Sequence, residues 1–181
     1  MHPFLTIDET SINTHLETSD RTGYTLREAA RAVVIDDNKK VALLHVSNGD
    51  YYKLPGGGIE EGEDVQDALA RELLEEIGCK AEIIANLGTV REFRFYWNLE
   101  QLSYAYVARA IGTKGQPSFT DKEVEDGFAI VWVDTVQHAI HLLEQSPLNT
   151  QPESPKSYNM TFMRLRDSAI ARKALPIIDS L

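Results

Sequence analysis

Apolar residues along this chain fall into short runs separated by polar turns, a pattern typical of β-strands. The first predicted strand spans residues 29–36, and a polar turn joins it to a second strand at residues 41–46, so that the two form a hairpin. Residues 51–55 then lead into a run of three glycines at 56–58. Further strands are predicted at residues 81–86, 88–97, 101–111 and 128–133.

Residues 64–77 predict a helix. This stretch contains no proline or glycine, and it begins with acidic residues that suit a helix N-terminus. It ends at Gly78, a residue type that often closes helices in the left-handed conformation. Its apolar residues lie on most of its sides, which predicts a helix packed between two layers rather than on the surface. These residues are Val65, Ala68, Leu69, Ala70, Leu73, Leu74 and Ile77.

Two more helices are predicted near the C-terminus. Asp134 or Thr135 caps a helix that runs to about residue 145, with apolar residues spaced i, i+3, i+4 and i+7. Residues 146–157 contain three prolines and are predicted to be a loop or linker. A last amphipathic helix is predicted at residues 161–175, where it could cap a pocket or mediate a homodimer.

The order of these elements predicts an α/β/α sandwich around a mixed β-sheet, with one helix layer on each face. Residues 1–28 are predicted to be an N-terminal arm or an edge strand, because residues 1–24 are polar and irregular. The main domain is placed at residues 29–146, and residues 147–181 form a C-terminal linker and helix packed on that domain.

Composition limits the classes of function. The chain has 181 residues, 43% of them hydrophobic, which suits one globular domain with a real core. Its 18 basic and 28 acidic residues give a net charge of −10, which argues against binding a nucleic acid polymer. The single cysteine, Cys79, excludes an internal disulfide and is interpreted as a buried structural thiol. The sequence shows no signal peptide or long apolar run, so a cytoplasmic protein without a membrane partner is expected.

Three carboxylates stand out on the helix at residues 64–77. Glu72, Glu75 and Glu76 are spaced i, i+3 and i+4, so they share one face within about one turn. Like charges placed so closely repel each other, which indicates that a cation lies among them. Carboxylate oxygens suit hard divalent cations such as Mg²⁺ or Mn²⁺, and these ions bind phosphate oxygens. The direct interpretation is metal-dependent chemistry on a phosphate.

The wider spacing around these glutamates resembles a known signature. Gly57, five residues, Glu63, seven residues, then Arg71-Glu72-Leu73, one residue, Glu75-Glu76, one residue, Gly78 and an apolar Cys79 match the Nudix box at each of its fixed positions. The chain therefore resembles the Nudix hydrolase family, which includes the MutT-like enzymes. The box covers residues 57–79, and the strand pattern extends the resemblance over about residues 30–145.

The resemblance implies roles for individual residues. Glu72, Glu75 and Glu76 would be metal ligands, and the backbone carbonyl near Gly56 would complete the site. Arg71 would orient the box glutamates with Glu63 as its partner, and Gly57 and Gly78 would shape the ends of the box. An additional carboxylate before the last strand, Glu123 or Glu125, is a candidate metal ligand or general base, and Glu72 is an alternative base.

Residues flanking the box are candidates for contacts with a substrate. Tyr51 or Tyr52 could stack on a base, and Lys53 could meet a phosphate. In Nudix folds the sheet wall that follows the box lines the substrate pocket. The corresponding candidates here are Arg91, Arg94 and Tyr104, and ordinary sheet packing with solvent-facing arginines is the alternative interpretation.

The expected activity is Mg²⁺- or Mn²⁺-dependent hydrolysis of the diphosphate linkage in a nucleoside diphosphate joined to another group. The box does not separate the substrates of the family, but the sequence shows no auxiliary motif for ADP-ribose, coenzyme A or diadenosine substrates, so a nucleoside triphosphate, ordinary or oxidised as for MutT-like enzymes, is the default. ADP-ribose and dinucleotide-like compounds are alternatives. A Nudix-fold sensor that binds a nucleotide without cleaving it is a second class, which the intact box carboxylates disfavour.

Overall fold

The computed structural model of the protein describes residues 2–13, 15, 17–145 and 155–181. Within these residues, one mixed sheet of seven strands has the order β1-β5-β6-β2-β3-β4, with β7 also paired to β3. The pairs β1 with β5 and β2 with β6 are parallel, and the other pairs are antiparallel. The strands are β1 (Leu5–Ile7), β2 (Thr25–Ile35), β3 (Val41–Val46), β4 (Tyr51–Lys53), β5 (Lys80–Arg94), β6 (Leu99–Ile111) and β7 (Phe128–Val133).

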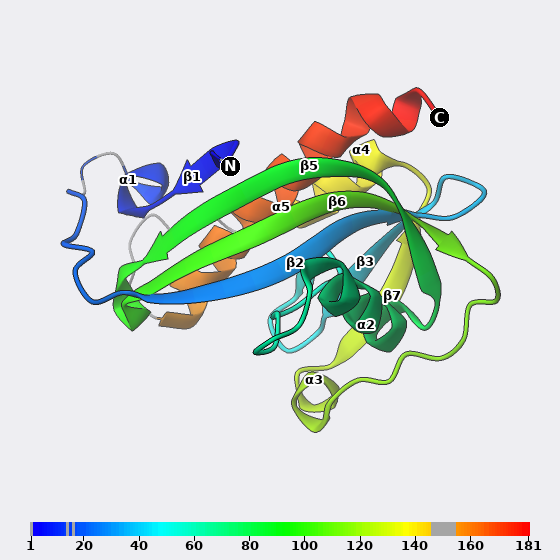
Figure 1. Cartoon of the computed structure of the whole chain (residues 1–181), viewed down its shortest axis with the longest axis horizontal. Coiled ribbons are helices and arrows are strands. Elements are labelled where there is room, and N and C mark those ends of the chain that lie inside the picture. Colours follow the sequence, from blue (N-terminus) through cyan, green and yellow to red (C-terminus); the bar gives the residue numbers. More distant parts are fainter. Residues whose placement is uncertain (1, 14, 16, 146–154) are drawn as a thin grey trace.

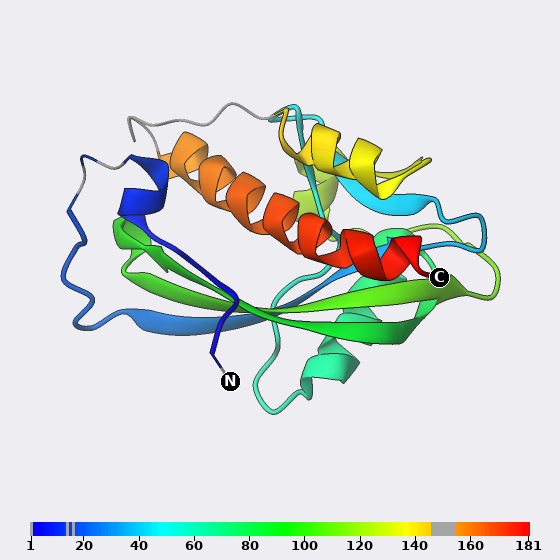
Figure 2. The same ribbon diagram turned by 90° about the horizontal axis from the view of Figure 1, so that it is seen from above.

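Helices cover both faces of this sheet, so the predicted α/β/α sandwich is confirmed (Figures 1 and 2). Helix α2 packs on one face, while α4 and the long α5 lie side by side on the opposite face. The helices are α1 (Glu9–Ile12), α2 (Val65–Ile77), α3 (Asp121–Glu125), α4 (Val136–Leu143) and α5 (Pro155–Asp179), with a 3₁₀ turn, η1 (Phe95–Trp97).

Strand β2 runs through the centre of the sandwich and is covered on both faces. Ala30, Ala32 and Val34 pack toward α2, in one hydrophobic cluster with Leu69 and Leu73 of that helix. Val33 and Ile35, on the other face of β2, belong to a larger cluster that includes side chains of α4 and α5. Double coverage explains why the last part of this strand, residues 32–35, is apolar without alternation.

Helix α2 begins and ends where its sequence predicts. The side chain of Asp64 caps the N-terminus by accepting a hydrogen bond from the Gln66 amide. Gly78 closes the helix with φ of 68° and donates its N–H to the Leu74 carbonyl. The loop after β6 adds two bonds at this end, from the Gly115 amide to the Gly78 carbonyl and from the Ser118 amide to the Glu75 carbonyl. The polar loop at residues 112–120 is therefore fastened to the end of the helix that carries the box.

The structure corrects the prediction of two separate strands at residues 81–86 and 88–97. A single long strand, β5, spans both, with register shifts against β6 between Ile83 and Ala85 and between Asn86 and Gly88. Such irregularities bend a strand without ending it. The strand stops at Arg94, because the next three residues form η1 and Asn98 then turns the chain in a left-handed conformation.

Both ends of the chain contribute to the fold. Strand β1 pairs in parallel with β5 at the edge of the sheet, so the edge-strand alternative holds for residues 5–7, and Ile7 is buried in the larger cluster. Helix α5 begins at Pro155, several residues before its predicted start, because proline is tolerated in a first helical turn. The prediction of a loop or linker at residues 146–157 is wrong for residues 155–157, which form the first turn of α5, and residues 146–154 lie outside the described residues. The domain boundaries after residues 28 and 146 stay predictions.

Candidate active site

Glu76 is the most buried carboxylate of the box. Only 2% of its surface is exposed, and it lies on the last turns of α2, against residues 56–58, here called the glycine turn. One of its oxygens accepts a hydrogen bond of 2.5 Å from the Gly56 amide, and the other accepts one of 3.0 Å from Lys53 Nζ. Because a buried charge is costly without partners, these two contacts fix the carboxylate in place.

Arg71 joins the box helix to the loop that precedes it. Its guanidinium donates two hydrogen bonds to Glu63, one to the Gly58 carbonyl, and one to Glu72 at 2.9 Å. A longer contact of 3.4 Å reaches Glu75 one turn on. The hydrogen bonds from Arg71 hold the pKa of Glu63 at about 2, well below its usual range. Arg71 therefore orients two of the three box carboxylates through one planar fork.

The glycine turn permits contacts that side chains would block. Gly56 has φ of 122°, and a Cβ on it would lie 2.2 Å from the Ala30 carbonyl oxygen. A Cβ on Gly57 would lie 2.3 Å from Oε1 of Glu72. The turn also pairs with β2, because the Ala30 amide donates to the Gly57 carbonyl at 3.0 Å. The backbone therefore lies directly against the carboxylates.

Alanine substitutions at these two glycines are expected to have different effects. Gly56→Ala forces a strained φ and a clash with backbone, so we expect a loss of stability of about 3 kcal/mol or more. Gly57→Ala meets only the flexible end of Glu72, so stability should fall by no more than about 1 kcal/mol while turnover drops about tenfold. Denaturant unfolding and steady-state kinetics measure both effects. Equal stability losses in the two variants would contradict this interpretation.

The three glutamates supply the donors that a hard divalent cation requires, namely carboxylate oxygens beside a backbone carbonyl. The pKa of Glu72 is raised by burial and by the nearby charges of Glu76 and Glu75, although the hydrogen bond from Arg71 acts against this. In the part of the chain that the structure describes, however, no three such side chains converge as a ready metal cage. Lys53 and Arg71 neutralise the carboxylates instead.

Comparison with known proteins identifies the family of this chain. A family model described as "NUDIX domain" matches residues 25–152, which is more than half of the chain. The chain belongs to the Nudix family. This confirms the resemblance drawn from the box, and the match includes the glycine turn, α2 and the loop before β7.

Solved structures of Nudix proteins share the fold of this chain. A MutT protein from Methanosarcina mazei Go1 superposes with a TM-score of 0.51 at 15% identity, over 80% of this chain and 96% of that one. A Nudix hydrolase from Nitrosomonas europaea gives a TM-score of 0.53 at 17% identity, over 78% and 90% of the two chains. At these identities the similarity establishes the architecture alone.

Curated relatives match over shorter stretches. A Bacillus subtilis protein, provisionally named an 8-oxo-dGTP diphosphatase, is 29% identical over 68 residues, covering 38% of this chain and 46% of the relative. An RNA pyrophosphohydrolase of a Nitratiruptor species is 36% identical over 86 residues, covering 44% and 56%. The Nudix chain thus spans about half the length of the curated relatives it matches.

Lys53 and the two tyrosines of β4 have different surroundings in this Nudix fold. Lys53 bonds Glu76 and lies over the Phe128 ring at 4.8 Å, so it belongs to the site. The Tyr52 ring contacts His45 in a tilted arrangement, with ring centroids 4.7 Å apart, and packs against the hydrophobic cluster beneath α4 and α5. Tyr51 is partly buried on the same strand. Of these three residues of β4, Lys53 is the one in direct contact with a box carboxylate.

The candidates on the sheet wall are each engaged with a neighbouring acid. Arg91 forms an ion pair of 3.2 Å with Glu100 on the adjacent strand. The Tyr104 hydroxyl donates to Glu28 at 2.7 Å, and this bond raises the pKa of Tyr104 to about 12. Arg94 is buried and donates to Glu92 at 2.6 Å. Their roles in substrate contact stay predictions.

The two glutamates of the loop before β7 lie on the short helix α3. Glu123 closes a capping box, where its carboxylate accepts bonds from the amide and hydroxyl of Thr120. Glu125 is exposed at the end of the helix. Glu123 is thus already occupied with a structural role.

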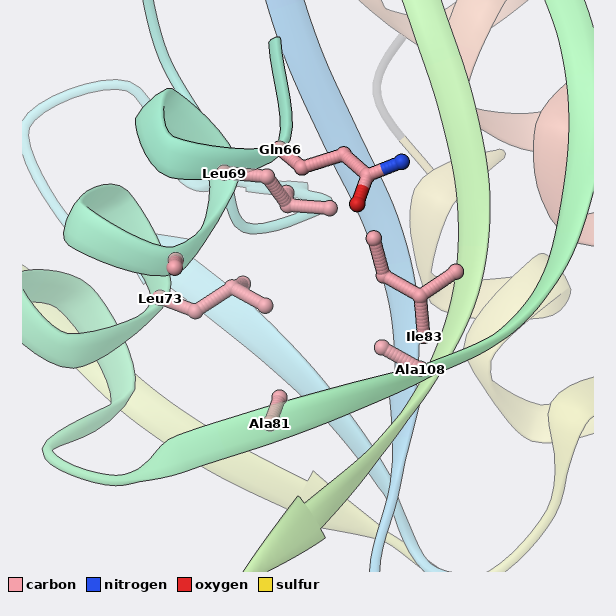
Figure 3. A pocket seen from close by; sticks show the side chains of 7 residues that line it. Gln66, Leu69, Leu73, Ala81, Ile83 and Ala108 are labelled. Carbon is pink, nitrogen blue, oxygen red and sulfur yellow. The ribbon is translucent and has the colours of Figure 1, made fainter. Parts of the chain in front are cut away.

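One hollow adjoins the loop before the box helix, and a second lies beneath the helix itself. A surface hollow of about 420 Å³ lies between residues 26–28 of β2 and residues 59–63 of the box loop, and Arg27 and several glutamates line it. Its size suits a small phosphorylated molecule. Between α2 and strands β5 and β6, a gap of about 30 Å³ is lined by Leu69, Leu73 and Ile83 among others (Figure 3). That gap is too small for a nucleotide.

Sequence reasoning missed a buried polar network on the face covered by α5. Arg31 donates to the Gly56 carbonyl at 2.8 Å, which leaves that oxygen a second lone pair. On α5, Arg166 and Asp167 are buried and bonded to each other. A signal existed, because Phe162, Arg166 and Ile170 are spaced by four residues, so a charge lies on the apolar stripe. Such a charge indicates a buried partner.

Cys79 is buried and carries a free thiol, as the sequence predicts, and burial raises its pKa. It has the character of a packing residue at the end of the box.

Across residues 2–13, 17–145 and 155–181, the helices lack the combination of length and apolarity that a bilayer-spanning segment needs.

Proposed function

We propose that this Nudix protein is a divalent-metal-dependent pyrophosphohydrolase that cleaves the diphosphate linkage of a nucleoside diphosphate derivative, with a nucleoside triphosphate as the default substrate. The observation that carries the proposal is the buried carboxylate of Glu76, held by the Gly56 amide on the same helix turn as Glu72 and Glu75. Three acids held this closely together by Lys53, the Gly56 amide and Arg71 are typical of the preorganised, electrostatically perturbed clusters found at functional sites.

Glu72, Glu75, Glu76 and the Gly56 carbonyl would hold Mg²⁺ or Mn²⁺, which when bound neutralises the diphosphate and lowers the pKa of the attacking water. Lys53 Nζ lies 3.0 Å from Glu76, so the same ammonium group would be near enough to the site to donate to a phosphate oxygen. Arg71 would keep Glu72 and Glu63 in place through the reaction.

A proton must leave the attacking water, and three glutamates compete for the role of base. Glu72 is best placed because it lies against the glycine turn, within the site. The carboxylate of Glu123 caps α3, and Glu125 is exposed at the end of that helix. We therefore favour Glu72 as the general base.

The choice of substrate rests on the names of relatives and on charge. The relatives act, by their names, on 8-oxo-dGTP and on RNA. The net charge of −10 disfavours a long polyanion and favours a small phosphorylated molecule. A triphosphorylated 5′ end of RNA nevertheless presents the same linkage as a nucleoside triphosphate, so it belongs among the candidates.

The decisive experiment measures phosphate and pyrophosphate release with Mg²⁺ across one panel. The panel holds ordinary nucleoside triphosphates, 8-oxo-dGTP, ADP-ribose, a dinucleoside polyphosphate and an RNA oligonucleotide with a 5′ triphosphate. We expect hydrolysis of a nucleoside triphosphate with the highest kcat/KM. Preference for ADP-ribose or the dinucleotide would move the protein to that alternative. Tight nucleotide binding with no turnover on any compound would establish a sensor instead.

Two further predictions concern the assembly and the location of the protein. A homodimer mediated by α5 stays a prediction, and so does a cytoplasmic location.

A further inference from the structure

The C-terminal helix α5 contacts the chain directly before the glycine turn through a buried carboxylate. The Leu54 amide donates a hydrogen bond of 3.0 Å to Asp167 Oδ2. Both residues are fully buried, although 113 positions separate them in the sequence. Helix α5 also lies outside residues 25–152, the range that the family model matches. The contact is therefore an addition of this chain to the Nudix domain.

The bond meets a need of the backbone. Strand β4 ends at Lys53, the last residue that pairs with β3, so Leu54 lies beyond the ladder. A buried amide without a partner is costly, and the carboxylate of Asp167 satisfies it. The Asp167 side chain therefore fixes the position at which the backbone enters the glycine turn.

Asp167 is itself held rigidly. Its second oxygen accepts a 2.6 Å hydrogen bond from Arg166 Nε, and Arg166 Nη1 reaches Glu92 of β5 at 3.4 Å. Burial alone would raise the pKa of Asp167, but Arg166 and Arg31 lower it, so the carboxylate stays charged. A charged acceptor forms a stronger bond to the Leu54 amide than a neutral one.

The turn is also held by strand β2. Arg31 of β2 donates to the Gly56 carbonyl, and the Ala32 amide donates to the Pro55 carbonyl at 3.2 Å. Pro55 has a fixed φ, so a displacement at Leu54 passes along the chain to Gly56. The Gly56 amide in turn sets the carboxylate of Glu76. A continuous path of contacts thus joins Asp167 to the box.

We propose that Asp167 is a positioning residue of the active site, which holds the entrance of the glycine turn and, through Gly56, the metal-binding carboxylate of Glu76. The inference rests on the proposed function for its link to the metal. Supporting groups around metal ligands typically change metal affinity or activity by about 10- to 100-fold when removed.

The test compares Asp167→Asn and Asp167→Ala with Ile170→Ala in the full-length protein. Ile170 is a matched control, because it is fully buried on the same helix and belongs to the hydrophobic cluster. Each variant is examined by thermal unfolding, by Mn²⁺ binding in electron paramagnetic resonance without nucleotide, and by kcat and KM. Hydrogen exchange of the Leu54 and Gly56 amides is followed by NMR.

We expect both Asp167 variants to weaken Mn²⁺ binding by about tenfold or more and to lower kcat more than they raise KM. The amides of Leu54 and Gly56 should exchange faster, with Asn milder than Ala because its amide oxygen still accepts a bond. Ile170→Ala should lower the melting temperature while leaving Mn²⁺ affinity and kcat unchanged.

Two results would overturn the inference. One is a folded Asp167 variant with wild-type Mn²⁺ affinity and wild-type exchange at Leu54. The other needs no variant: a Leu54 amide in the wild type that exchanges as fast as an exposed loop amide. If the wild type hydrolyses nothing but Asp167→Asn still weakens Mn²⁺ binding, the proposed function fails and the positioning role stands.

Discussion

Replacing Glu76 with glutamine is expected to lower the rate of nucleotide hydrolysis by about 10³-fold and to leave the fold intact. Glutamine keeps the shape of the side chain, and its oxygen can still accept the bond from the Gly56 amide. The variant loses the negative charge that would bind a divalent cation. A loss of about 4 kcal/mol in transition-state stabilisation corresponds to that factor.

The measurement combines kcat and KM at saturating Mg²⁺ with circular dichroism and thermal unfolding. Glu17→Gln is the control, because Glu17 is an exposed acid of the N-terminal segment, outside the box. It should retain wild-type activity. A Glu76→Gln protein that unfolds would instead show that this acid is structural, since Lys53 would lose its partner.

Removal of divalent cations is expected to abolish turnover, and added Mg²⁺ or Mn²⁺ should restore it. Without the cation, the carboxylates of the site would face a polyphosphate of the same sign, and Lys53 alone supplies too little positive charge. The rate should fall by at least about 10³-fold in excess chelator. Full activity under these conditions would exclude the metal mechanism.

The chelated protein should remain folded, which separates catalysis from stability. Each carboxylate of the box is already paired, Glu76 with Lys53 and both Glu72 and Glu75 with Arg71. We therefore expect the melting temperature in chelator to stay close to that of the metal-loaded protein. A large decrease would assign the metal a structural role.

The parts of the fold that the sequence predicts well are those set by local chemistry. Helix α2 has no internal breaker, an aspartate cap and a glycine stop, so its ends follow from neighbouring residues. Strands β3 and β7 are short apolar runs between clear turns, and the observed limits of both match the predicted ones. The contacts of Arg71 with Glu63 and Glu75 lie within one helix and its entry loop.

The parts that could not be predicted depend on pairing across long separations. The bent course of β5 is set by its register with β6, which the sequence of β5 alone does not encode. Asp167 meets Leu54 only because α5 lies across the sheet (Figure 2). A hydrophobic pattern identifies the buried stripe of such a helix, but it does not identify the partner of a charge on it.

The ion pair between Lys53 and Glu76 has a consequence for how the site would load its metal. The protein supplies its own counter-ion for Glu76, so Lys53 would have to leave this carboxylate before the carboxylate could hold a cation. The Lys53 ammonium group would then be available to donate to a phosphate oxygen, so metal binding and phosphate binding would both depend on the movement of this one side chain.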